Sequence, residues 1–302
     1  MIVRPRPNLL HLFIVRRGSI LIRIWPQILV VGVISLLVVI SHEFWPRYLP
    51  GFSSAPFALM GIALSVFMSF RNGACYDRWW EGRKQWGELI SLTRNLARQT
   101  LILSESERRY LLNLTIAFTH SLVQHLRPQS DTQAQVRRFT TEADAGQITQ
   151  SLNAPNMALS LISRKLAHLH RSGELADIPF QLLDKTVGAM GLVQAACERI
   201  RSTPVPFAYS LLLHRTAYLF CFLMPFAFAD SLGWLTPLAA MIIAYTFFGL
   251  DALGDELEEP FGLEENDLPL STMAAIMEQN LREAMGETDL PPIPLPDNYQ
   301  LT

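Results

Sequence analysis

The densest group of ionisable side chains lies in residues 251–267, towards the C-terminal end of the chain. This segment holds eight Asp and Glu residues and no Lys or Arg. Carboxylates in such number are ligands that hard cations such as Ca²⁺ prefer, although their spacing matches no EF-hand loop. A structural interpretation is that they pair with arginines near the N-terminus: Arg4 and Arg6, or Arg16 and Arg17. The segment leaves a metal-binding and a structural hypothesis open.

No other group of residues has the spacing of a catalytic or metal site. His120 and His125 lie five apart and His168 and His170 two apart, so neither pair forms the face of an H-E-x-x-H helix. The three cysteines form no C-x-x-C pair, which argues against a zinc site or a disulfide framework. Fingerprints of nucleophile elbows, phosphate loops and dinucleotide sites are missing, and no basic stripe with aromatics indicates nucleic acid. The sequence therefore predicts a protein other than an enzyme.

The elements that must position these residues are apolar helices. Half of the chain is hydrophobic and 17% is charged, which is too apolar for an ordinary soluble enzyme and too charged for a wholly buried membrane protein. A lone membrane span needs about 20 apolar residues. Four shorter stretches, with Trp or Tyr near their ends, are expected to shield one another in a membrane, unless they form the core of a soluble protein. The stretches are 25–40, 57–70, 217–229 and 234–250.

The distribution of positive charge predicts the orientation of these spans. Five arginines precede the first stretch, and Arg71, Arg78, Arg83 and Lys84 follow the second. The connection 41–56 carries one Arg, and the connection between the third and fourth stretches carries no base. The positive-inside rule then places both termini and the middle region in the cytoplasm, in a multi-pass protein of the inner (plasma) membrane.

Between the second and third stretches lies a polar region with helical periodicity. In residues 84–205 apolar positions recur every three or four residues, and no segment alternates as a strand does. We therefore expect an all-α protein with a cytoplasmic helical region. Residues 286–302 are rich in proline and are expected to form a flexible tail. The expected parts are a basic segment (1–24), two spans with a pore neck (25–83), the helical region (84–205), two further spans (206–250), an acidic segment (251–285) and the tail (286–302).

Two stripes of side chains run along the second apolar stretch. Gly61, Ser65 and Ser69 are four residues apart and form a small-residue stripe, which lets helices approach closely in a membrane. Beside it lies a stripe of bulky apolar residues. In a monomer both stripes would be plain packing, but several copies around an axis would turn the bulky stripe into three apolar rings, a constriction that gates by dewetting. The bulky stripe consists of Ile62, Val66 and Phe70.

A charged and Trp-rich segment, "RNGACYDRWWEGRKQWGEL", follows the position where the apolar helix is expected to end, Phe70. If the apolar stretch lines a pore, Arg71 and Asn72 lie where the bore meets the cytoplasmic part. Trp79 and Trp80 stand at the depth where an amphipathic ring is favoured. An ordinary interfacial anchor would explain the Trp pair equally well.

This segment resembles the bestrophin family in its bacterial branch, where an apolar pore helix is followed by an Arg-Trp-Trp motif, here Arg78, Trp79 and Trp80. The resemblance extends to "CERIRSTPVPFAYSLLLHRTAYLFCFLMPF" (197–226) and "GDELEEPFGLEENDLPL" (254–270), and it covers the chain to about residue 285. It implies a homopentamer in the lipid bilayer, with one central path for permeant ions.

The resemblance also implies two constrictions. The neck of the family is formed by three apolar residues that end eight positions before the Arg of the motif, here Ile62, Val66 and Phe70. A second aperture is an apolar residue in the cytoplasmic helical region. We place it at Phe180, with Ile178 as the fallback, while a plain core aromatic is the alternative interpretation of Phe180.

Eukaryotic members of the family are gated by calcium through an acidic run after a Pro-Phe-Gly motif. Here the motif at 260–262 is followed by Glu264 and Asp267, while Glu256 and Glu259 stand where animal members have amide side chains. Glu in place of an amide changes both charge and reach. We therefore expect that no cofactor is required, with a calcium clasp at these four residues as the alternative.

The expected function is passive conduction of small monovalent ions, with selectivity set by ring size, wetting and charge at the mouths of the pore. An anion such as chloride is favoured by analogy with animal members, and a cation stays open because apolar rings discriminate poorly on charge. The alternatives are a transporter or a metal-dependent membrane enzyme that uses the acidic cluster 251–267, and a membrane-tethered helical binding module. Ionisable groups are scarce in the predicted spans, where transporters place them.

Overall fold

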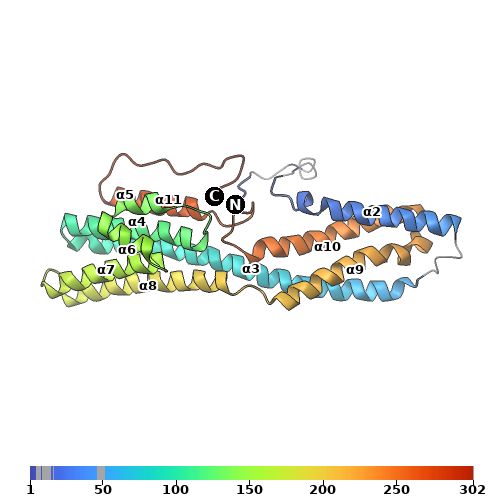
Figure 1. The fold of residues 1–302 in the computed structure, drawn as a ribbon, viewed down its shortest axis with the longest axis horizontal. Helices are drawn as coiled ribbons and strands as arrows, with labels where there is room; N and C mark the ends of the chain where they lie inside the picture. Colours follow the sequence, from blue (N-terminus) through green and yellow to red (C-terminus); the bar gives the residue numbers. More distant parts are fainter. Residues whose placement is uncertain (5–7, 9–14, 16, 46–51, 302) are drawn as a thin grey trace. The chain divides into compact units, whose positions relative to one another are not determined.

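The structure, a computed structural model, describes residues 1–4, 8, 15, 17–45 and 52–301 (Figure 1). Within these residues the regular structure is helical, and the β-structure consists of isolated bridges, so the all-α expectation is confirmed. The chain divides into two compact units, which we name the apolar unit and the polar unit. The apolar unit comprises Arg4–Trp79 and Pro204–Pro260, and the polar unit comprises Met1–Val3, Trp80–Thr203 and Phe261–Thr302.

The apolar unit is built from long helices with little charge. Three helical stretches of the described chain are long and apolar enough to cross a membrane, and they are Leu21–Phe44, Ser54–Ile102 and Phe207–Glu258. The first is helix α2 (Leu21–Phe44), and the third comprises α9 (Phe207–Leu232), the turn η2 (Gly233–Leu235) and α10 (Thr236–Glu258). Flanking residues thus extend the short apolar stretches seen in the sequence. A helix of 24 residues is about 36 Å long, which exceeds a hydrocarbon core of about 30 Å.

Helix α3 (Ser54–Gln99) does not end at Phe70, contrary to our expectation. It continues without a break for 46 residues and belongs to the apolar unit up to Trp79 and to the polar unit from Trp80. The change from apolar to charged residues makes the helix prefer water to lipid, but it does not end the helix. The segment after Phe70 contains no proline, so its helix propensity stays high.

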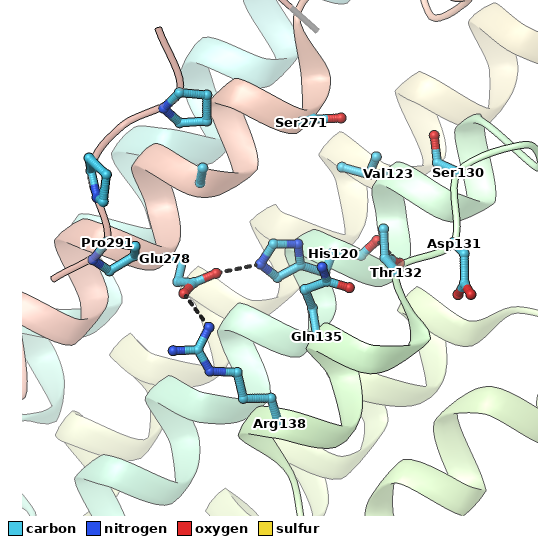
Figure 2. Close-up of a pocket in the computed structure, with 13 residues that line it drawn as sticks. His120, Val123, Ser130, Asp131, Thr132, Gln135, Arg138, Ser271, Glu278 and Pro291 are labelled. Atoms are coloured by element: carbon cyan, nitrogen blue, oxygen red, sulfur yellow. Dashed lines mark hydrogen bonds and ion pairs between the residues drawn. The ribbon is translucent and has the colours of Figure 1, made fainter.

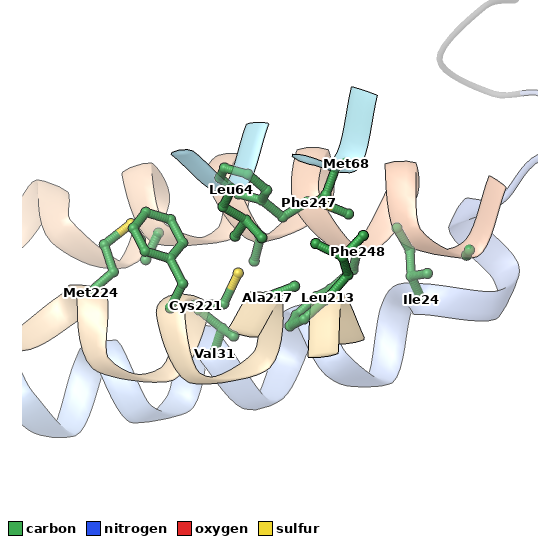
Figure 3. Close-up of a cluster of buried hydrophobic side chains, with 14 residues drawn as sticks. Ile24, Val31, Leu64, Met68, Leu213, Ala217, Cys221, Met224, Phe247 and Phe248 are labelled. Atoms are coloured by element: carbon green, nitrogen blue, oxygen red, sulfur yellow. The ribbon is translucent and has the colours of Figure 1, made fainter. Parts of the chain in front are cut away.

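The core of the apolar unit joins α2, α3, α9 and α10 (Figure 3). Leu64 and Met68 of α3 and Phe247 of α10 point into it. A Cβ added to Gly32 of α2 would lie 2.9 Å from the sulfur of Met241 in α10. Glycine at this position therefore lets these two helices approach closely, as small residues do in membrane bundles.

The polar unit surrounds a central, largely buried helix, α4 (Glu105–Leu126), which contacts α5, α7, α8 and α11. Side-chain caps begin several of its helices. The caps of α4, α6 and α7 are Ser104, Thr141 and Asn153, each of which accepts a backbone N–H three residues on. The other helices are α5 (Gln133–Phe139), α6 (Glu142–Gln150), α7 (Ala154–Arg171), α8 (Asp177–Ser202) and α11 (Leu270–Ala284).

The proline-rich segment 286–302, for which we expected a flexible tail, makes contacts with the rest of the polar unit. The side chain of Gln279 in α11 donates to the carbonyl oxygen of Pro291 at 3.3 Å. Further along, Gln300 forms an antiparallel bridge with Ile2. Proline lacks an N–H but keeps its carbonyl acceptor, so donors outside the segment can hold it against the polar unit.

Candidate functional site

The three predicted neck residues form an exposed apolar stripe on α3. Ile62, Val66 and Phe70 are 64%, 47% and 67% exposed. On the opposite side of the same helix, Leu64 and Met68 are buried at 2% and 1% in the core of the apolar unit. One face of the helix is thus fixed by its own unit, while the other presents bulky side chains that the described part of the chain leaves uncovered.

In the neighbouring small-residue stripe, Gly61 faces another helix of the chain, whereas Ser65 and Ser69 are exposed. A Cβ built on Gly61 would lie 3.1 Å from the ring of Phe220, so glycine allows α9 to approach α3. The hydroxyl of Ser65 donates to the carbonyl oxygen of Gly61 at 2.8 Å and is satisfied within its own helix. Gly61 therefore brings α3 close to α9, while the bulky stripe stays on the outside.

Directly after the stripe, Arg71 stands at the centre of a buried ion cluster. Its side chain is 1% exposed, with Nη1 3.1 Å from Oδ1 of Asp251 and Nη2 2.6 Å from Oδ1 of Asp255. A third carboxylate, that of Glu258, lies 3.6 Å away. We expected Arg71 where the bore meets the cytoplasmic part; it follows Met68 by three residues and shares the buried face of the helix.

A histidine and a second arginine complete the ion cluster. His214 of α9 places Nδ1 2.5 Å from Oδ2 of Asp251 and Nε2 3.5 Å from Oδ1 of Asp255. At the edge, Arg23 lies 3.7 Å from Asp255 and 3.9 Å from Glu256, and its side chain is 47% exposed. Four helices, α2, α3, α9 and α10, thus contribute to one network of charges.

In this network the acidic segment forms ion pairs within the chain, and Arg23 and Arg71 are among its partners. The carboxylates of 251–258 pair with Arg23 and Arg71, of which only Arg23 lies in the N-terminal segment. Of the arginines that we expected, Arg6 and Arg16 lie outside the described residues. The alternative functions that used the acidic cluster therefore lose four of its carboxylates to ion pairs.

The Arg-Trp-Trp motif holds the end of α10. Arg78 donates from Nε to the carbonyl oxygen of Glu258 at 3.0 Å. Because α10 ends at Glu258, this carbonyl lacks an intrahelical partner, and a cation there also meets the negative end of the helix dipole. Trp79 stacks on Tyr76, with ring centroids 6.3 Å apart, and Trp80 is 46% exposed.

The two candidates for the second constriction lie in the first turn of α8. Phe180 is half-buried, and its ring stacks on His170 of α7 with centroids 4.7 Å apart. Ile178 is 72% exposed. The structure therefore gives Phe180 a packing role and leaves Ile178 as the side chain that projects outward.

Comparison with known proteins places this arrangement in a family. The model of bacterial and fungal bestrophin proteins matches residues 1–283. The chain belongs to the bestrophin family. A protein of Mesorhizobium japonicum named a voltage-dependent anion channel-forming protein is 45% identical, over 98% of this chain and 95% of its own length. A protein of the same name from Salmonella typhi is 41% identical over the full length of both chains. The solved structure of a bacterial bestrophin homologue from Klebsiella pneumoniae matches with a TM-score of 0.84 at 37% identity, over 87% of this chain and 99% of that one.

Membership of this family makes the protein a channel and not an enzyme. The sequence alone indicated the three stripe residues of this bestrophin but missed the ion cluster. The spacing of Asp251, Asp255 and Glu258 contained the missing indication, because residues separated by four and then three positions share one helix face. Three carboxylates on one helix face require a cationic partner, and Arg71, at the end of an apolar stretch, was a candidate for it.

The loop after the Pro-Phe-Gly motif of this bestrophin is closed by its own hydrogen bonds. The backbone N–H of Glu264 donates to Oδ2 of Asp267 at 2.6 Å. Arg127 of α4 donates to the carbonyl oxygens of Phe261 and Leu268 at 2.8 and 2.5 Å. Burial raises the pKa of Asp267 to about 7, although the bond from Glu264 and the charge of Arg127 act in the opposite direction.

Two of the four candidate clasp residues, Glu256 and Asp267, have partners within the chain. Glu256 is engaged with Arg23, and Asp267 is engaged with a backbone N–H and faces a guanidinium. No group of three His, Cys, Asp or Glu residues in the described ranges is placed to hold a metal ion. Calcium prefers six to eight oxygen ligands, and the calcium clasp at these residues stays a prediction.

Proposed function

We propose that this bestrophin is a homopentameric channel for small anions such as chloride, with the α3 stripe lining its neck. The observation that carries the proposal is the exposed stripe of Ile62, Val66 and Phe70 on a helix whose opposite face is fixed in its own unit. Five copies around an axis would stack these side chains as three apolar rings, which pass ions when wetted and block them when dry. The names of its relatives support anions as the permeant species.

The same proposal includes four spans, with both termini in the cytoplasm and the protein in the inner (plasma) membrane. Ion pairs at the two ends of the apolar unit support it. Arg23, near the start of α2, pairs with Asp255, near the end of α10. His42, near the end of α2, lies 2.5 Å from Asp230, near the end of α9. These pairs fit an arrangement in which α2 and α9 run outward and α10 runs inward, as the positive-inside rule requires.

The second constriction belongs to the same proposal, and we now favour Ile178. An aperture residue must present its side chain to the ion path, and the exposed Ile178 meets this condition better than Phe180, which packs on His170. Replacing Ile178 with alanine should then widen the aperture, whereas the same change at Phe180 should mainly loosen the contact between α7 and α8.

The reversal potential of the purified protein in a planar bilayer, under a KCl gradient, tests the permeant ion. A reversal near the chloride Nernst potential supports anion conduction. A reversal near the potassium value would overturn the anion assignment and leave the channel assignment standing. The mass of the detergent-solubilised particle tests the assembly, which should contain five copies of the 34.1 kDa chain.

Single-channel conductance tests the neck. Val66→Ala and Phe70→Ala remove bulk from the proposed rings and should raise conductance. Leu219→Ala is the matched control, because Leu219 is a 56% exposed apolar residue on α9 and not on the helix that carries the stripe. Conductances of the neck variants that match both the control and the parent protein would refute the neck assignment.

A further inference from the structure

A pocket of ≈ 470 Å³ in the polar unit is lined by none of the residues that we propose for the ion path. It lies between α4, α5, α11 and the proline-rich segment (Figure 2). Its volume is in the range of small-molecule sites, which combine apolar walls with a few polar groups. The lining residues that matter most are His120, Val123, Arg138, Ala275, Glu278 and Pro291.

The floor of the pocket is a buried pair of polar side chains. His120 and Glu278 are 8% and 6% exposed, and Nε2 of His120 lies 2.9 Å from Oε2 of Glu278. Burial alone would raise the pKa of Glu278, but the bond from His120 and the charges of Arg138 and Arg282 hold this pKa below its ordinary value. Glu278 is therefore ionised, and Nε2 of His120 is the donor in this bond.

The floor offers more cationic N–H groups than the single carboxylate accepts. Nη1 of Arg138 lies 3.7 Å from Oε1 of Glu278, which is too long for a hydrogen bond, and the side chain is 56% exposed. Nη1 of Arg282 lies 3.5 Å from the same oxygen and is buried with no hydrogen-bond acceptor among the described residues. Arg282 does not line the pocket, so the N–H groups of Arg138 are the cationic donors that a bound acceptor would meet.

The walls indicate what kind of molecule would bring that acceptor. Val123, Ala275 and Pro291 supply apolar surface on three sides. Asp131, on the opposite rim, accepts a backbone N–H from Gln133 at 3.0 Å, which occupies one of its oxygens. A bare inorganic ion would use the floor but leave the apolar walls unfilled.

We propose that this pocket binds a small organic carboxylate. Its oxygens would accept from the free N–H groups of Arg138, in the planar geometry that favours guanidinium for carboxylates. Its carbon body would lie against the apolar walls formed by Val123, Ala275 and the proline segment. The site is independent of the proposed neck, so it can be tested without measuring current.

Isothermal titration of the purified full-length protein with butyrate, succinate and benzoate, each compared with its amide at constant ionic strength, tests the proposal. At least one carboxylate should bind, and its amide should bind at least about tenfold more weakly. A hydrogen bond to a charged group is stronger than one to a neutral group by an energy that corresponds to about this factor in Kd. Arg138→Gln should weaken binding by a similar factor. Arg137→Gln, a neighbouring arginine that does not line the pocket, should leave binding unchanged. Ala275→Phe should abolish binding by filling the pocket while the guanidinium stays in place.

Three results would overturn the proposal. The first is that none of the three carboxylates binds at about 10 mM. The second is that Arg138→Gln and Arg137→Gln bind alike, with thermal unfolding showing both variants folded. The third is that inorganic phosphate competes as well as the organic carboxylate, which would make the pocket a general anion site.

Discussion

Replacing Arg71 with methionine would leave the ion cluster without its central cation. Asp251 would remain with a side chain only 7% exposed and with His214 as its nearest partner. Removing one partner of a buried ion pair costs about 3–5 kcal/mol, because an uncompensated charge stays buried. For a protein of this length we expect a fall in the melting temperature of roughly 10 °C. Methionine fills much of the same volume, so a cavity contributes little to this loss.

Two companion variants separate charge from packing. Asp251→Asn in the Arg71→Met background should restore part of the stability, because it removes the buried charge, whereas the same change in the parent protein should destabilise. Arg23→Met removes an arginine of the same cluster that is 47% exposed and contacts carboxylates at 3.7 and 3.9 Å. It should change stability by less than about 1 kcal/mol.

Thermal unfolding in detergent, followed by tryptophan fluorescence, compares these variants directly. We expect a large loss for Arg71→Met, a partial recovery with Asp251→Asn and a small effect for Arg23→Met. If Arg71→Met and Arg23→Met unfold at the same temperature, burial of the cluster is not what makes Arg71 important, and its assignment as the central cation of a buried network is refuted.

Raising the pH from about 4 to 7 should destabilise the polar unit, because burial raises the pKa of native Asp267 from 3.8 to about 7, and the folded protein then retains a proton that the unfolded chain releases. Urea titrations measure the free energy of unfolding at each pH, and Asp267→Asn should make it depend less on pH. An unchanged dependence would contradict the assignment. Gly254→Ala would place a Cβ 2.6 Å from the side chain of Asn72 and should lower stability by about 1–3 kcal/mol. Gly146→Ala, with nothing within 4 Å, should be neutral or stabilising by up to about 1 kcal/mol in the same thermal assay. Burial raises the pKa of the Cys197 thiol to about 12, so iodoacetamide at pH 8 should modify it only after unfolding, as mass spectrometry can show.

Periodicity predicted the stripe because helix geometry alone determines which residues share a face. Ile62, Val66 and Phe70 are four apart, and no tertiary contact is needed to align them. The end of α3 was misplaced for a related reason. A fall in hydrophobicity at Arg71 marks a change of surroundings, while a helix ends where its backbone is interrupted.

The ion cluster and the tail depend on contacts between distant residues. Arg71 and Asp251 are 180 positions apart, and their pairing follows only once α3 and α10 lie side by side. In the tail, the carbonyl oxygen of Pro291 is held by a donor from α11, and composition alone gives no sign of this. Low periodicity predicts the lack of a helix but not the lack of partners.

Because α3 is unbroken, the direction in which the stripe points around the helix axis is fixed relative to the direction of Arg71. A single residue inserted after Phe70 would turn one of them about 100° away from the other. An insertion or deletion of seven residues is the shortest that would bring the two back to within about 20°. Evolution can therefore retune this part of the helix by exchanging side chains but not by changing its length, and gaps between related sequences should collect in the loops instead.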